Sequence, residues 1–141
     1  MTIRELNIDE IRQTYKAHLK YDFPSDERKP LAMILNSHKK GNYLCLGAYS
    51  GDEQVGYAFF IFCGRICLLD YYAVVRSRRG QGIGTEFLSY LRTSELKSRC
   101  DYLLIEVEDP QYMSFCEPEC LKARRSRVSI QPKSGLCRCM E

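Results

Sequence analysis

The sequence predicts an α/β (α+β) domain in which helices flank a mostly antiparallel central sheet. Three observations support this fold class. Apolar residues recur at helical spacing in the first part of the chain, three apolar runs separated by short turns follow, and a glycine-rich loop then leads into another amphipathic segment. A chain of 141 residues can bury one core and is too short for two, so we expect residues 1–141 to form a single domain.

The first elements are predicted to be a short strand and two helices. Residues 2–6 form the strand candidate. Asn7 and Glu10 have the spacing of a capping box, and apolar residues at helical spacing follow them. Pro30 suits the first turn of the second helix, and Gly41 suits its end.

The period then changes to that of a sheet. Residues 43–49, 54–63 and 66–75 are strand candidates joined by turn-like sequences, which predicts an antiparallel meander. A helix is expected from the glycine-rich loop to about Lys97, and residues 102–107 form a last strand candidate.

Charge and hydropathy exclude several classes of function. The net charge of +3 gives no general reason to expect nucleic-acid binding, and the whole excess lies in residues 116–141, so a nucleic-acid module using that basic tail is the weakest alternative. No apolar run approaches the roughly 20 residues that span a bilayer. No signal-peptide pattern follows Met1, so we expect a cytoplasmic protein without a membrane partner.

The loop between the third apolar run and the following helix carries the sharpest signal. Glycines allow main-chain N–H groups to approach a ligand, and the first turn of a helix leaves such groups without partners. Arg78 and Arg79 add positive charge beside Gly80, Gly82 and Gly84, so a phosphate or pyrophosphate ligand is expected. No Lys follows the last glycine as a P-loop requires, and the spacing and antiparallel context disfavour a dinucleotide fingerprint.

Arg79-x-x-Gly82-x-Gly84, together with the preceding apolar strand, resembles the acyl-CoA motif of the GNAT superfamily of N-acetyltransferases. The resemblance implies a GNAT-like fold and acetyl-CoA as co-substrate. It also implies that one strand segment contacts the pantetheine arm and that the loop holds the pyrophosphate. The implied cofactor-binding residues are Ala73, Val74, Val75, Arg79, Gly80, Gln81, Gly82, Ile83, Gly84 and Thr85.

The implied reaction is attack of a primary amine, from a small molecule or a protein, on the thioester. A lysine-like amine has a pKa of about 10.4 and is mostly protonated at neutral pH, and a nearby carboxylate can act as general base. Glu106 is the first candidate, because it alternates with apolar residues on a strand that borders the cleft in GNAT folds. Asp70 is the second, as an acid inside an apolar run, and a structural hydrogen bond is the competing interpretation for both.

Residues 111–141 depart from the family pattern. No aromatic residue follows Phe115, and only Tyr112 lies near the position of the tyrosine that often protonates the departing thiolate in the family, so the general acid is left unassigned. We expect a divergent or incomplete C-terminal segment. A catalytically inactive CoA-binding domain that acts through interactions is therefore the alternative function. The spacing of Cys116, Cys120, Cys137 and Cys139 is atypical for zinc, so no metal is expected. A sheet edge left exposed would allow a homodimer.

Overall fold

The computed structural model describes residues 1–93 and 96–105 and contains one five-stranded sheet in the order β1-β2-β3-β4-β5. The first three pairings are antiparallel, and β4 pairs with β5 in parallel. This arrangement confirms the predicted fold class. The strands are β1 (Thr2–Glu5), β2 (Tyr43–Ser50), β3 (Glu53–Cys63), β4 (Ile66–Val74) and β5 (Tyr102–Ile105).

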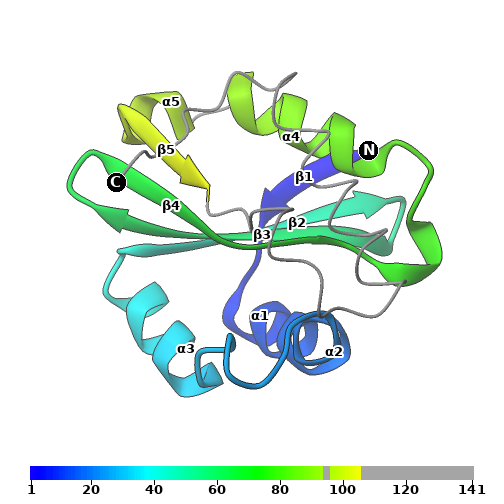
Figure 1. Cartoon of the computed structure of the whole chain (residues 1–141), viewed down its shortest axis with the longest axis horizontal. Helices are drawn as coiled ribbons and strands as arrows, with labels where there is room; N and C mark the ends of the chain where they lie inside the picture. Colours follow the sequence, from blue (N-terminus) through cyan, green and yellow to red (C-terminus); the bar gives the residue numbers. More distant parts are fainter. Residues whose placement is uncertain (94–95, 106–141) are drawn as a thin grey trace, which may run out of the picture.

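Helices cover both faces of the sheet (Figure 1). Those on one face are α1 (Ile8–Thr14), the π-helix η1 (Tyr15–Leu19), α2 (Lys20–Asp22) and α3 (Leu31–Lys39). Those on the other face are α4 (Ile83–Thr93) and α5 (Leu96–Arg99). The 3₁₀ turn η2 (Arg76–Arg78) connects β4 to the loop that precedes α4.

Each face of the sheet has its own apolar core. The α4-side core joins Phe87, Leu88 and Leu91 of α4 to Phe60 and other sheet residues. The α1-side core joins the helices before β2 to buried aromatic residues of β2, β3 and β4. Because β3 contributes to both cores, its apolar run is nearly continuous, as expected for a central strand.

A bulge in β4 changes which face its side chains reach. Phe59 pairs with Tyr71 and Phe60 pairs with Leu69, so Asp70 is an extra residue without a partner in β3. Cys67 and Leu69 pack in the α4-side core, whereas Tyr71 packs in the α1-side core. Strict alternation would have kept all three odd-numbered side chains on one face.

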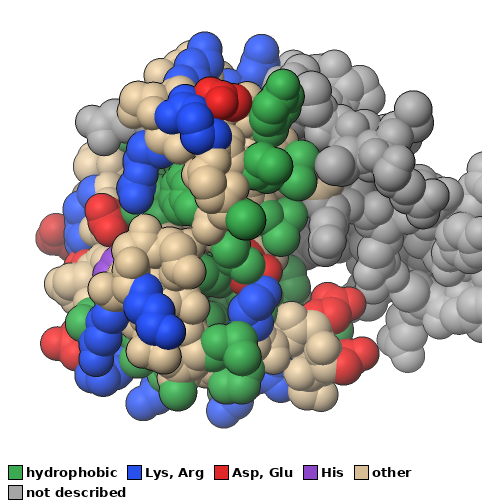
Figure 2. Space-filling view, turned by 90° about the vertical axis from the view of Figure 1, so that its left-hand side faces the viewer, with side chains coloured by type: hydrophobic (Ala, Val, Ile, Leu, Met, Phe, Trp, Pro, Cys, Tyr) green, Lys and Arg blue, Asp and Glu red, His purple; other side chains and the backbone are tan. Residues whose placement is uncertain are grey.

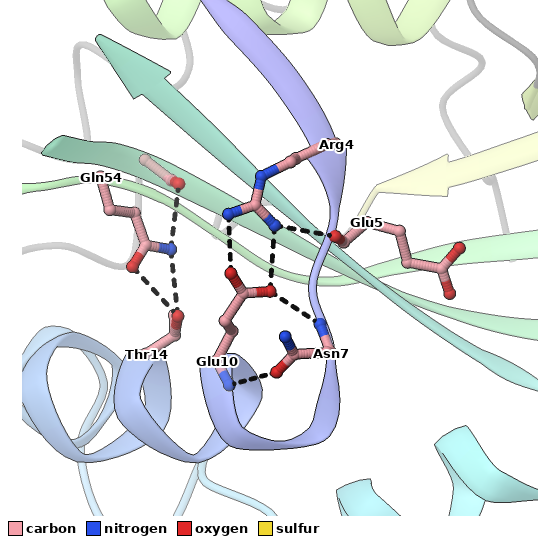
Figure 3. A network of polar contacts seen from close by, with 7 residues as sticks. Arg4, Glu5, Asn7, Glu10, Thr14 and Gln54 are labelled. Carbon is pink, nitrogen blue, oxygen red and sulfur yellow. Dashed lines mark hydrogen bonds and ion pairs between the residues drawn. The ribbon is translucent and has the colours of Figure 1, made fainter. Parts of the chain in front are cut away.

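The beginning of α1 is fixed by the predicted capping box (Figure 3). The Glu10 N–H donates to Asn7 Oδ1 at 2.9 Å, and the Asn7 N–H donates to Glu10 Oε2 at 2.9 Å. Arg4 also donates to both oxygens of Glu10, at 3.0 and 2.6 Å, and this hydrogen-bonded pair lowers the pKa of the Glu10 carboxyl. The N-terminal strand is thereby tied to the first helix.

The predicted boundaries agree closely with the observed strands β2, β3 and β4. Glu106, residues 111–141 and the four tail cysteines lie outside the described residues. Among the residues that the structure describes, no helix combines the length and the apolar character needed to cross a membrane.

Candidate active site

The candidate site lies where β4 leaves the sheet and α4 begins. Gly80 and Gly82 have φ angles of 79° and 80°, a left-handed conformation that glycine adopts without steric cost. A Cβ atom at either position would meet no atom within 4 Å. The main chain of this loop is therefore open to a ligand at two positions that also require glycine.

The first turn of α4 supplies hydrogen-bond donors at the same place. The Glu86 N–H makes the first helical bond, to the Gly82 carbonyl at 3.1 Å, so the N–H groups of Ile83, Gly84 and Thr85 have no acceptor within the helix. Aligned peptide dipoles add partial positive charge at this end. The arrangement suits a phosphate group.

The α4 helix is anchored to β4 through Gly84. The Tyr72 hydroxyl donates to the Gly84 carbonyl at 2.5 Å, and a Cβ atom on Gly84 would lie 3.3 Å from that hydroxyl oxygen. Burial raises the pKa of Tyr72, so the hydroxyl keeps its proton and remains a donor. The third glycine of the motif thus allows close packing of helix on strand, a different role from that of Gly80 and Gly82.

The two arginines at the loop entrance are bound to protein acids. Arg78 hydrogen-bonds to both oxygens of Glu53, which lowers the pKa of the Glu53 carboxyl. Arg79 donates from Nε to the Val74 carbonyl at 2.9 Å and from one terminal nitrogen to Asp22 Oδ1 at 2.8 Å. Both guanidinium groups thus bind the protein itself, while their side chains remain 35% and 41% exposed, and the main-chain groups of the loop add further donors.

The predicted pantetheine segment follows the bulge. Within the described residues, β4 pairs with β5 from Ile66–Tyr102 to Leu69–Ile105, and residue 106 lies outside them. Ala73 and Val74 pair with β3 on the other side, and the Val75 N–H donates to the Val55 carbonyl at 2.9 Å. The segment from Ala73 to Val75 is thus held by β3 and leads directly into the loop.

Asp70, the second candidate base, binds two side chains at the bulge. Lys29 Nζ lies 2.6 Å from Oδ1, and the Tyr43 hydroxyl donates to Oδ2 at 2.5 Å. The Asp70 side chain is 10% exposed and that of Lys29 is 35% exposed. Burial, together with the Asp70 charge, raises the pKa of Tyr43, which therefore stays protonated. Figure 2 shows the face at the left-hand side of Figure 1, on which hydrophobic side chains gather between groups of charged ones.

Three functional candidates are absent from the sequence prediction: Asp22, Lys29 and Tyr43. Each of them binds a residue at least 27 positions away in the chain, and the Tyr43–Asp70 bond has the shortest separation. The only local signal was an acid and a cation around the helix break at residues 23–26, and such residues are usually solvated. Their roles depend on tertiary contacts.

A family model described as the acetyltransferase (GNAT) family matches residues 8–114. A search of curated proteins found no match. Among solved structures, the chain resembles a GNAT-family protein from Bacteroides thetaiotaomicron, with 16% identity, a TM-score of 0.72, and coverage of 96% of this chain and 71% of that one.

The ribosomal-protein-S18-alanine N-acetyltransferase from Escherichia coli is 19% identical with a TM-score of 0.68, and the match covers 95% of this chain and 76% of that one. An aminoglycoside 6′-N-acetyltransferase complexed with coenzyme A is 18% identical with a TM-score of 0.61, and the match covers 96% and 84% of the two chains. At these identities the likeness shows a shared fold.

Proposed function

Because the chain belongs to the acetyltransferase (GNAT) family, we propose that it transfers an acetyl group from acetyl-CoA to a primary amine. The observation that carries this proposal is the open glycine main chain at the beginning of α4, placed where β4 ends. The family supplies the reaction class, and this loop supplies a place for the cofactor's pyrophosphate.

The loop residues fit that group in shape and in charge. Gly80 and Gly82 have open space where side chains would stand, and the first-turn amides of α4 offer donors for anionic oxygens. The acetyl-CoA pantetheine arm would follow Ala73, Val74 and Val75 towards the bulge. Asp70 precedes this segment by three residues in β4, so it would lie towards the thioester end of the arm.

The acceptor that this site favours is a cationic primary amine. Lys29 already places such a group, an ammonium on an alkyl chain, on the Asp70 carboxylate. Each Asp70 oxygen has a second lone pair, so an acceptor ammonium would share the carboxylate with Lys29 and the Tyr43 hydroxyl. The two relatives named for their substrates act on an alanine of a ribosomal protein and on an aminoglycoside, which are both amines.

In the proposed reaction the amine loses a proton to a carboxylate, its nitrogen bonds to the acetyl carbon, and the carbon–sulfur bond breaks. CoA leaves as a thiolate and is protonated. We assign the general base first to Glu106, and second to Asp70. Both oxygens of Asp70 already accept hydrogen bonds, so Asp70 suits binding and orienting the amine better than removing its proton.

A thiol-release assay over a panel of amines tests the proposal. The panel contains an aminoglycoside, a peptide with N-terminal alanine and a peptide with an internal lysine. Glu106→Gln should lower kcat at least 100-fold with little change in acetyl-CoA affinity. Asp70→Asn should mainly raise the KM for the amine. If acetyl-CoA binds but no amine releases thiol, the protein is the CoA-binding domain without turnover, and the enzyme proposal is wrong.

A further inference from the structure

Asp22 is a buried acid at the end of α2, far in sequence from the cofactor loop. Its side chain is only 3% exposed. The Tyr57 hydroxyl donates to Oδ2 at 2.8 Å, Arg79 donates to Oδ1 at 2.8 Å, and Arg76 Nε lies 3.5 Å from the same oxygen. The Asp22 carboxylate therefore binds Tyr57 of the central strand β3. It also binds Arg76 and Arg79, the first and last residues of the segment that leads from η2 into the glycine loop.

The arginines are held at second points as well. Arg79 Nε donates to the Val74 carbonyl at the end of β4, and a terminal nitrogen of Arg76 donates to the Tyr21 carbonyl at 2.6 Å. A guanidinium is planar, so two bonds in different directions fix its orientation. Arg79, the residue immediately before Gly80, thereby connects the last residue of β4 to the end of α2.

A buried carboxylate requires such partners. An unpaired charge in this position would be strongly destabilising, and charge-assisted hydrogen bonds are stronger than neutral ones. The position of the Arg79 side chain is therefore set from outside the loop, by Asp22, which precedes the loop in the sequence. Gly80 and Gly82, which have the greatest backbone freedom, follow directly after this fixed point.

We propose that Asp22 is a positioning residue for the cofactor loop, acting through Arg79, and that Arg79 serves the loop as an internal anchor and makes no direct contact with the pyrophosphate. This inference rests on the proposed function. It departs from the expectation that the Arg79 side chain adds positive charge for the ligand.

The two roles of Arg79 predict different effects of Asp22→Asn on acetyl-CoA binding. If Arg79 binds the pyrophosphate directly, removal of the competing negative charge frees it, and acetyl-CoA binds as well as before or more tightly. If Arg79 anchors the loop, the same change loosens the anchor and weakens binding. Asparagine keeps an oxygen that can accept from Tyr57, so the substitution mainly alters the interaction with the arginines.

Titration calorimetry with acetyl-CoA distinguishes these outcomes. We expect Asp22→Asn to raise the Kd about tenfold, which corresponds to about 1.4 kcal/mol. Asp101→Asn is the matched control: it removes an ion pair of 2.6 Å with Arg65, before the beginning of β4, and should leave the Kd unchanged. An unchanged or lower Kd for Asp22→Asn would overturn the proposal.

Arg79→Lys provides a second variant in case Asp22→Asn folds poorly. Lysine keeps the charge but cannot bond to Val74 and Asp22 with a planar fork, so the Kd should again rise about tenfold. The double variant should bind no more weakly than the weaker single variant, because both changes break one interaction. Wild-type affinity in Arg79→Lys, or fully additive losses, would contradict the anchor.

A kinetic and a ligand-free readout separate this inference from general loss of structure and from failure of the proposed function. Asp22→Asn should raise the KM for acetyl-CoA and leave kcat at saturating acetyl-CoA within twofold. Hydrogen exchange of the free protein should show faster exchange in residues 76–85 than in the Asp101→Asn control. If wild type binds no acetyl-CoA, the proposed function fails while this measurement still tests the anchor, and unchanged exchange refutes it.

Discussion

Replacement of Gly82 by alanine separates the backbone conformation of the loop from its role in binding. The φ angle of Gly82 is 80°, and a Cβ atom placed there would meet no atom within 4 Å. The protein itself therefore has room for the methyl group, and the only expected cost to stability is backbone strain. A bound pyrophosphate, in contrast, would have to occupy the space that the methyl group enters.

The magnitude follows from the conformation. Left-handed backbone costs an L-residue about 1–2 kcal/mol, so the free energy of unfolding should fall by that amount. For a domain of this size, that corresponds to a decrease in Tm of about 3–7 °C. Gly51 is the matched control, because its φ angle is 61°, it also has open space around it, and it lies in the turn between β2 and β3.

Thermal unfolding and acetyl-CoA calorimetry should be run on Gly82→Ala and Gly51→Ala together. Both variants should lose similar stability, but only Gly82→Ala should bind acetyl-CoA more weakly, by at least tenfold. Gly82→Asp should weaken binding further, because it adds negative charge to an anion site. Equal affinities in the two alanine variants, with equal losses of stability, would refute the assignment of this loop to the pyrophosphate.

Two further predictions concern titratable groups. Glu10→Gln should lower the free energy of unfolding at pH 7 by about 0.5–1 kcal/mol, because the amide loses the ion pair with Arg4. The pKa of Glu10 is lowered in the folded state, so the extra stability of the wild type is present above the unfolded pKa of about 4.3 and is lost as the pH falls through the folded pKa. Urea titrations of both proteins at pH 7 and pH 3 check this. An equal difference in the free energy of unfolding at the two pH values would contradict it. Burial raises the pKa of Cys67 to about 12 and also raises that of Cys45, so neither thiol should react in the native protein. Iodoacetamide at pH 8 should label the exposed Cys63 in the native protein, and Cys45 and Cys67 only in denaturant. Peptide mass spectrometry measures the labelling.

Most of the fold could be predicted from the sequence because its signals are local. The capping box of Asn7 and Glu10 needs only a spacing of three residues, and it forms as predicted. The strands around the two short turns are similarly fixed by apolar runs and turn residues. The π-helix between α1 and α2 was not predicted, because its apolar positions differ little from those of an α-helix.

The bulge at Asp70 shows why the site was harder to predict. The sequence marks Asp70 only as an acid in an apolar run, and an ordinary strand would have placed it opposite a residue of β3. The register change instead leaves it without such a partner, beside Lys29 and Tyr43. Pairing register and contacts over tens of residues depend on the whole sheet, and a single sequence does not encode them in any short pattern.

The segment that links the first helices to α3 connects the two halves of the candidate site. Asp22, at one end of it, binds Arg79 beside the cofactor loop, and Lys29, at the other end, binds Asp70 at the bulge. Between these points the segment is also held by Tyr71, whose hydroxyl accepts from the Lys29 N–H at 2.7 Å and donates to the Glu27 carbonyl at 3.1 Å. Polar contacts with β4 and the loop thus hold both ends, so a change in this segment should alter both the cofactor side and the acceptor side, although its residues carry no recognisable motif.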